Sequence, residues 1–247
     1  MIPIKFKFDN DDYFTGEAFK KLRTNIMFCG TDVRVIAFTS CGMYEGKTTV
    51  CIELARAMAK VGKKVLLIDS DMRKSVMLTR YTDEKGIVGL SQYLSGMVEK
   101  DKVIYSADVS DEQSCDKFDI VFAGLFPPNP AELLGGSKFK EFIEEEKKNY
   151  DYIIIDTPPL GAVIDAAIVA AVCDSAVMVI GINTVKYRQA IDVKNQLEKS
   201  GCRVLGVVLN DVSGKKGLMY GSNFKHNKYS YYAKVYEDAG EKGQPDK

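Results

Sequence analysis

The sequence predicts an α/β fold in which a mostly parallel central sheet carries helices on both faces. Several short runs are almost entirely apolar, which is typical of strands buried on both sides of a parallel sheet. Segments with helical periodicity separate these runs along the chain. The first strand leads into a helix through a loop that contains Gly46-Lys47-Thr48, a sequence typical of phosphate-binding loops at such a junction. Together these features predict a P-loop NTPase-like architecture.

The expected elements alternate along the chain. Strands are expected over residues 33–39, 64–69, 118–123, 152–156, 175–182 and 204–209. Helices are expected over residues 17–28, 48–61, 130–150 and 186–199, with Gly62 ending the second of them. From residue 213 onward aliphatic side chains become rare. We therefore expect residues 1–212 to form the folded domain and residues 213–247 to form a mobile tail.

Composition excludes several classes of protein. The 247 residues carry 34 basic and 34 acidic side chains, so bulk electrostatic capture of nucleic acid is not expected. The six cysteines form no C-x-x-C pair and the chain has one histidine, so the usual zinc spacing is missing. A reduced, cytoplasmic compartment is expected. No run approaches the roughly 20 apolar residues that span a bilayer, so any membrane role is expected to come through a partner.

The loop over residues 40–49 has the composition of an ATP phosphate site. Lys47 is expected to neutralise the β- and γ-phosphates, and Thr48 to place its hydroxyl on Mg²⁺. Cys41 stands where the strict motif has its first glycine, so this loop departs from that pattern. The expected nucleotide-binding residues of the loop are Gly42, Tyr44, Glu45, Gly46, Lys47, Thr48 and Thr49.

Two strands are expected to end in an aspartate near this loop. Asp69 and Asp156 each close an apolar run, and the carboxyl ends of parallel strands share one edge of the sheet. With Thr48, they are the expected Mg²⁺ ligands. Asp71 is a second candidate for metal or water contact, but it could equally cap a helix or a turn. Asn210 could contact the adenine or could serve in a turn.

Several segments resemble the bacterial tyrosine kinases. Residues 65–73 resemble their additional acidic motif, and residues 150–159 resemble their Walker B strand. Residues 89–96 and 127–134 resemble further signatures of the family, and the match runs from about residue 17 to residue 210. The resemblance implies that residues 1–212 are a P-loop kinase domain. It also implies that Lys47, Asp69, Asp71 and Asp156 are catalytic, with Asp69 as the first candidate for the base that accepts the phenol proton.

The resemblance further implies autophosphorylation of the C-terminal tail in trans. The implied acceptors are Tyr220, Tyr229, Tyr231, Tyr232 and Tyr236. Residues 16–28 resemble the oligomerisation helix of the family, with Glu17, Lys20 and Arg23 on one side. Lys20 stands where the family has arginine, which removes a bidentate fork from the implied ring contact.

The implied biology is control of capsular or extracellular polysaccharide synthesis and export. The family resemblance implies a transmembrane activator or adaptor that recruits the chain to the inner face of the membrane, and a cognate tyrosine phosphatase. One alternative is a partition- or division-type ATPase switch, although Gly42 occupies the place of the second lysine of those proteins. Another alternative is a regulatory module that only binds ATP.

Overall fold

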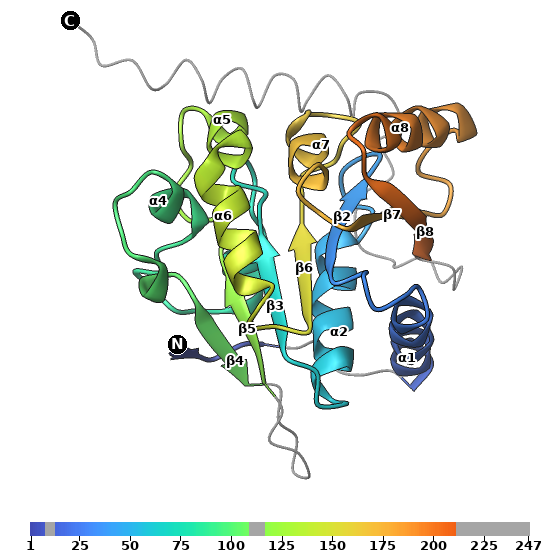
Figure 1. Cartoon of the computed structure of the whole chain (residues 1–247). Helices are drawn as coiled ribbons and strands as arrows, with labels where there is room; N and C mark the ends of the chain where they lie inside the picture. The colour runs from blue at the N-terminus through green and yellow to red at the C-terminus, as the bar shows by residue number, and fades with distance from the viewer. Residues whose placement is uncertain (8–12, 109–116, 211–247) are drawn as a thin grey trace, which may run out of the picture.

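The computed structural model describes residues 1–7, 13–108 and 117–210 (Figure 1). The predicted tail and its five tyrosines lie outside these residues. In the described chain a single eight-stranded sheet has the order β1-β4-β5-β3-β6-β2-β7-β8. All neighbouring strands are parallel except β4 and β5, which confirms a mostly parallel sheet. The strands are β1 (Ile2–Ile4), β2 (Val35–Ser40), β3 (Val65–Asp69), β4 (Tyr105–Asp108), β5 (Lys117–Val121), β6 (Tyr152–Asp156), β7 (Ser175–Gly181) and β8 (Arg203–Asn210).

Helices cover both faces of the sheet, as predicted. Figure 1 shows α6 and α7 in front of the sheet and α2 behind it, and each face has its own buried apolar cluster. In the described residues no helix combines the length and the apolar character needed to cross a membrane. The helices are α1 (Tyr13–Met27), α2 (Lys47–Ala59), α3 (Met77–Tyr81), α4 (Leu90–Leu94), α5 (Pro130–Gly135), α6 (Ser137–Glu146), α7 (Asp165–Ala170) and α8 (Tyr187–Lys199), with a 3₁₀ turn over Lys100–Lys102.

Some predicted elements differ from the structure. The helix expected over residues 130–150 is wrong as one element: α5 and α6 meet at Gly136, whose φ of −72° and ψ of 158° are extended. Two consecutive glycines at this point weaken a continuous helix. The short strands β1 and β4 and the short helices α3, α4 and α7 were not predicted.

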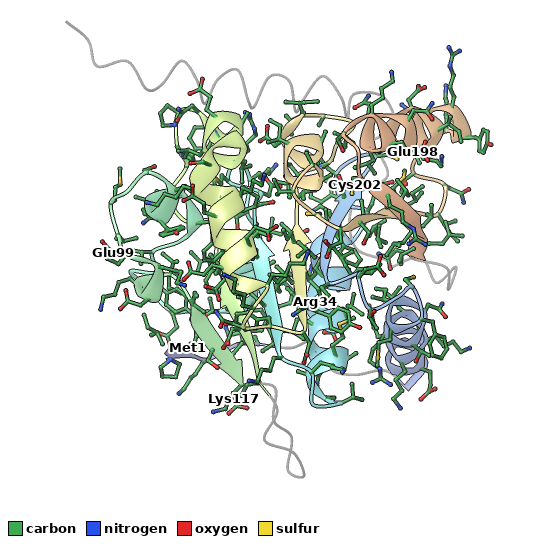
Figure 2. All side chains as sticks on the ribbon, in the orientation of Figure 1. Met1, Arg34, Glu99, Lys117, Glu198 and Cys202 are labelled. Atoms are coloured by element: carbon green, nitrogen blue, oxygen red, sulfur yellow. The ribbon has the colours of Figure 1, made fainter. Side chains whose placement is uncertain are left out.

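The sheet topology brings the predicted site residues together. Strands β3, β6 and β2 are adjacent, and Asp69 lies directly across from Asp156 in the β3–β6 register. The loop that leaves β2 starts α2 at the same edge. Arg34 lies at the opposite end of the strands, just before β2 (Figure 2). Its guanidinium donates to the carbonyl oxygens of Lys147 at 2.7 Å and Tyr150 at 2.5 Å. The polar site therefore lies at one end of a sheet that is tied together at the other.

Candidate active site

The phosphate loop connects β2 to α2 in a conformation that requires unusual backbone angles. Gly46 precedes the first residue of α2 and has a φ of +81°. A Cβ at this position would lie 1.9 Å from Nδ2 of Asn210. Only glycine satisfies both the left-handed backbone and this close approach. Tyr44 has a φ of +60° and yet is not glycine.

A buried carboxylate holds the loop from inside the protein. Glu45 is 2% exposed, and it accepts the Gly42 N–H at 2.7 Å and the Thr184 hydroxyl at 2.5 Å. The amide of Asn210 donates to the Glu45 carbonyl oxygen at 3.0 Å. The loop is thereby anchored to the segments that follow β7 and end β8. The carboxylate of Glu45 binds these protein groups, and the expected nucleotide contact of Glu45 stays a prediction. Thr184 was not predicted as part of the site.

Asp156 is the centre of the charged cluster. Its Oδ1 forms an ion pair with the Lys47 ammonium, and its Oδ2 accepts the Thr48 hydroxyl at 2.7 Å. The Cys51 thiol lies 3.7 Å from Oδ1. Burial disfavours the charged form of Lys47, but the carboxylates of Asp156 and Asp71 outweigh burial and raise the Lys47 pKa above its usual value. Lys47 therefore stays a cation, as phosphate binding requires.

The segment that follows β3 folds around two carboxylates. Asp69 accepts the Ser75 hydroxyl, and it accepts the Asp71 N–H at 3.1 Å. Asp71 in turn accepts the Lys74 N–H at 2.9 Å. Burial raises the pKa of both carboxyl groups, and the charge of Asp156 raises that of Asp69 further. A raised pKa makes a carboxylate a better proton acceptor, which is the role expected of a general base.

The donor set suits Mg²⁺. Thr48, Asp69 and Asp156 offer hard oxygen atoms, the ligands this ion prefers. Within the described ranges, no group of three or more His, Cys, Asp or Glu residues forms a complete metal cage. Mg²⁺ is usually held by one or two carboxylates together with nucleotide phosphates and water, and Asp69 and Asp156 would supply those carboxylates.

A second ion pair borders the site and was not predicted. Arg73 donates from Nε to Asp165 Oδ2 at 2.6 Å and from Nη2 to Oδ1 at 3.0 Å. Asp165 opens α7 and is 1% exposed. This bidentate contact ties the acidic segment after β3 to the segment after β6. The place of Arg73 two residues after Asp71 indicated that it lies near the site. Its partner Asp165 could not be predicted, because it is 92 residues away in the chain.

The residues of the predicted oligomerisation helix lie on α1. Lys20 and Glu17 pair with each other at 2.7 Å, and both are exposed at the side chain. Arg23 donates to the Ala57 carbonyl oxygen of α2 at 3.0 Å. None of the three lines the phosphate pocket, which the phosphate loop forms with Asp69, Asp71 and Asp156.

The fold and this site define a P-loop NTPase. Residues 33–200 match the AAA domain family. Tyrosine-protein kinase CpsD of Streptococcus agalactiae is 41% identical over 199 residues, which cover 81% of this chain and 84% of that protein. Tyrosine-protein kinase YwqD of Bacillus subtilis is 37% identical over 219 residues, covering 88% and 86%. The kinase domain of Escherichia coli tyrosine kinase ETK superimposes with a TM-score of 0.72 at 31% identity, covering 85% of this chain and 80% of that one.

The chain therefore belongs to the AAA domain family and to the bacterial tyrosine kinases, and it is a protein-tyrosine kinase. The septum site-determining protein MinD of Pyrococcus horikoshii, solved with Mg-ADP, also resembles it with a TM-score of 0.59 at 24% identity. That likeness shows only that the two proteins share a fold. The fold alone is compatible with a division-type ATPase switch, but the matches to tyrosine kinases favour the kinase.

Proposed function

We propose that this kinase transfers the γ-phosphoryl group of Mg-ATP to tyrosines, and that these include the tail tyrosines of a second copy of the chain. The observation that carries the proposal is the convergence of Lys47, Thr48 and Asp156 with Asp69 at one edge of the sheet. This arrangement places the phosphate-binding ammonium of Lys47 beside Asp156, the proposed metal ligand, and Asp69, the proposed proton acceptor.

Each residue has a defined task in the proposed reaction. Mg-ATP supplies the electrophilic phosphoryl group. Lys47 would bind phosphate oxygens, and the Thr48 hydroxyl with the Asp69 and Asp156 carboxylates would hold the metal directly or through water. A phenol has a pKa near 10 and keeps its proton at neutral pH, so a base must accept it. Asp69 accepts that proton, and Asp71 is the second candidate because both lie in the same buried segment.

Asn210 is the proposed contact of the adenine base. The Asn210 amide nitrogen binds the Glu45 carbonyl oxygen, which leaves its Oδ1 as the remaining acceptor. An acceptor at this place suits the exocyclic amino group of adenine. We keep the adenine contact as part of the proposal.

The tail is the proposed substrate of a neighbouring subunit. Tyr220, Tyr229, Tyr231, Tyr232 and Tyr236 are the proposed acceptors, and five tyrosines within 17 residues is an unusual density. Glu17, Lys20 and Arg23 are the proposed contacts of a ring-shaped homo-oligomer. The exposure of Lys20 and Glu17 supports this role, because such contacts must be accessible.

The wider proposal concerns polysaccharide export. We infer that the kinase acts in the cytoplasm, that a transmembrane activator or adaptor recruits it to the membrane, and that a cognate tyrosine phosphatase reverses its action. One relative supports this proposal: it is described as a putative tyrosine-protein kinase in the cps region of Klebsiella pneumoniae, and it is 36% identical over 214 residues, which cover 83% of this chain and 28% of that protein. No nucleic-acid partner is proposed, since the net charge is zero.

A mixing experiment tests the reaction in trans. A Lys47→Met chain with an intact tail is incubated with Mg-ATP and an active chain that lacks residues 213–247. Mass spectrometry of the Lys47→Met chain is expected to find phosphate on its tail tyrosines. Phosphotyrosine confined to the active chain's own molecules, or absent from both, contradicts the trans proposal.

A matched variant controls for the loss of a lysine. Lys60 lies at the C-terminal end of the same helix α2 and is exposed, so Lys60→Met is expected to phosphorylate the tail as the unmodified chain does. ATP hydrolysis without phosphotyrosine in the unmodified chain favours the switch. Nucleotide binding with neither reaction favours the regulatory module.

A further inference from the structure

Tyr44 occupies a backbone position that disfavours it. Its φ of +60° lies in the left-handed region, which costs a bulky L-residue about 1–2 kcal/mol. Its side chain is 78% exposed, so core packing does not offset this cost. A strained, exposed aromatic in a phosphate loop points to a role for the side chain itself.

Tyr44 lines the phosphate pocket together with the carboxylates of the segment that follows β3. The same pocket is lined by Asp69, Asp71, Lys74 and Arg80, but neither Thr184 nor Asn210 lines it. The Lys74 ammonium lies 6.0 Å from the centroid of the Tyr44 ring. Tyr44 therefore faces the segment after β3 and not the segments after β7 and β8, to which Glu45 anchors the loop.

The acceptor must approach on this side. Lys47, Asp69 and Asp71 line one pocket, so an acceptor that reaches the phosphoryl group held by Lys47 must enter this pocket. The mouth at that place is formed by an aromatic ring from one segment and an ammonium group from the other. An aromatic ring stacks favourably on another ring, and an ammonium stabilises negative charge on an oxygen.

We propose that Tyr44 and Lys74 form the acceptor half of the site and select a phenol over an aliphatic hydroxyl. This inference rests on the proposed function, because it assigns the acceptor of that same site. The acceptor ring stacks on Tyr44 while Lys74 faces its oxygen. Serine and threonine offer no ring, and their hydroxyls lie too close to their own backbone to reach as deep a site.

The transfer step balances with the groups named. The phenol oxygen forms a bond to the γ-phosphorus as the bond from that phosphorus to the β,γ-bridging oxygen breaks. ADP leaves with the electron pair, and the phenol proton passes to the carboxylate of Asp69. The Lys74 ammonium attracts the charge that develops on the phenol oxygen.

Peptide binding to the full-length chain tests the assignment without requiring turnover. The probe is a fluorescein-labelled peptide of residues 225–238, which contains four of the tail tyrosines, in the presence of Mg²⁺ and a non-hydrolysable ATP analogue. Tyr44→Gly is expected to raise the peptide Kd about 2- to 12-fold, the range of one aromatic pair. Glycine suits the left-handed backbone, so this variant keeps the loop and its amides.

Three comparisons complete the test. Tyr44→Phe keeps the ring and is expected to bind the peptide as the unmodified chain does. Tyr187→Ala removes a tyrosine of similar exposure, 82%, from α8 and is expected to have no effect. The same peptide with serine at its four tyrosine positions is expected to bind the unmodified chain as weakly as the tyrosine peptide binds Tyr44→Gly.

Several results overturn the inference. They are an unchanged peptide Kd in Tyr44→Gly, a Kd for the ATP analogue that rises as much as that of the peptide, or equal binding of the serine and tyrosine peptides. An increase for the nucleotide alone also overturns the inference and identifies Tyr44 as the nucleotide contact that the sequence predicts. The proposed function fails separately, since it requires phosphotyrosine on the tail whether or not Tyr44 selects it. Lys74→Met is expected to slow phosphorylation at saturating peptide while the peptide Kd changes little, and an unchanged rate contradicts the role of Lys74.

Discussion

Replacing Gly46 by alanine tests how the phosphate loop is built. The residue has a φ of +81°, and an added Cβ would lie 1.9 Å from Nδ2 of Asn210. Two costs follow: the left-handed backbone strains alanine, and the Asn210 side chain must swing away. When it does, the 3.0 Å hydrogen bond from Asn210 to the Glu45 carbonyl oxygen is lost.

The expected magnitude is the sum of these costs. The strain contributes about 1–2 kcal/mol, and the hydrogen bond about 0.5–1.5 kcal/mol. Gly46→Ala is therefore expected to lower the free energy of unfolding by about 1.5–3.5 kcal/mol. Gly62→Ala is the matched control, because Gly62 has a φ of +76° with nothing within 4 Å of its added Cβ. It is expected to cost only the strain.

Urea unfolding of four variants measures both costs. Asn210→Ala alone is expected to cost about 0.5–1.5 kcal/mol. The double variant Gly46→Ala/Asn210→Ala is expected to cost no more than Gly46→Ala, because the hydrogen bond can be lost only once. The reasoning is refuted if Gly46→Ala costs no more than Gly62→Ala, or if the two single effects simply add in the double variant.

Three further predictions concern the loop, its border and the buried thiols. Glu45→Val removes the acceptor of two hydrogen bonds and is expected to lower the free energy of unfolding by about 1–3 kcal/mol and to weaken ATP binding. Glu45→Gln can still accept from the Gly42 N–H and is expected to lose less of both. Equal losses for the two variants in urea unfolding and nucleotide titration contradict this prediction. Asp165→Asn leaves Arg73 without its carboxylate and is expected to reduce the rate of phosphorylation more than it raises the KM for ATP, so an unchanged rate refutes a positioning role. Burial raises the pKa of Cys41 to about 12 and that of Cys202 to about 11, so iodoacetamide at pH 8 is expected to spare both thiols in the folded chain and to label them in urea. Rapid labelling of either thiol in the folded chain contradicts this protection. Because these pKa values are raised on folding, the neutral thiols contribute stability that is complete below about pH 9 and declines as the pH rises toward the folded pKa values.

The central strands could be predicted because their own residues determine them. Strands β2 and β3 are buried along their whole length, and β6 is buried in all but its first residue, so their sequences are almost continuous apolar runs. The edge of the sheet beyond β5 was harder to predict. Strand β1 has three residues and β4 reads Tyr-Ser-Ala-Asp, so neither carries a periodic signal, and their pairing depends on residues far away in the chain.

The residues of the candidate site likewise divide into those that local sequence determines and those whose partners lie far away in the chain. Lys47, Thr48, Asp69 and Asp156 could be predicted, because each stands at a strand end or helix start that the local sequence defines. The contact of Glu45 with Thr184 could not, because 139 residues separate the two. Local sequence sets the backbone of the loop, but only the packed sheet decides which protein groups its side chains reach.

Asn210 shows how a local pattern can leave a residue's partner open. Its place at the end of a strand near the phosphate loop was predicted, and the structure puts it there. Its amide nitrogen contacts the loop backbone, an interaction that no spacing in the sequence indicates. The adenine contact stays a prediction for its oxygen.

Intact-chain mass spectrometry with phosphotyrosine mapping, after incubation with Mg-ATP, tests the central claim most directly. The unmodified chain is expected to gain phosphate on the tyrosines of residues 220–236, with none on a Lys47→Met chain incubated alone and little on Asp69→Asn. A chain that turns ATP into ADP while its tyrosines stay unmodified, with the transmembrane partner present or absent, would contradict the account.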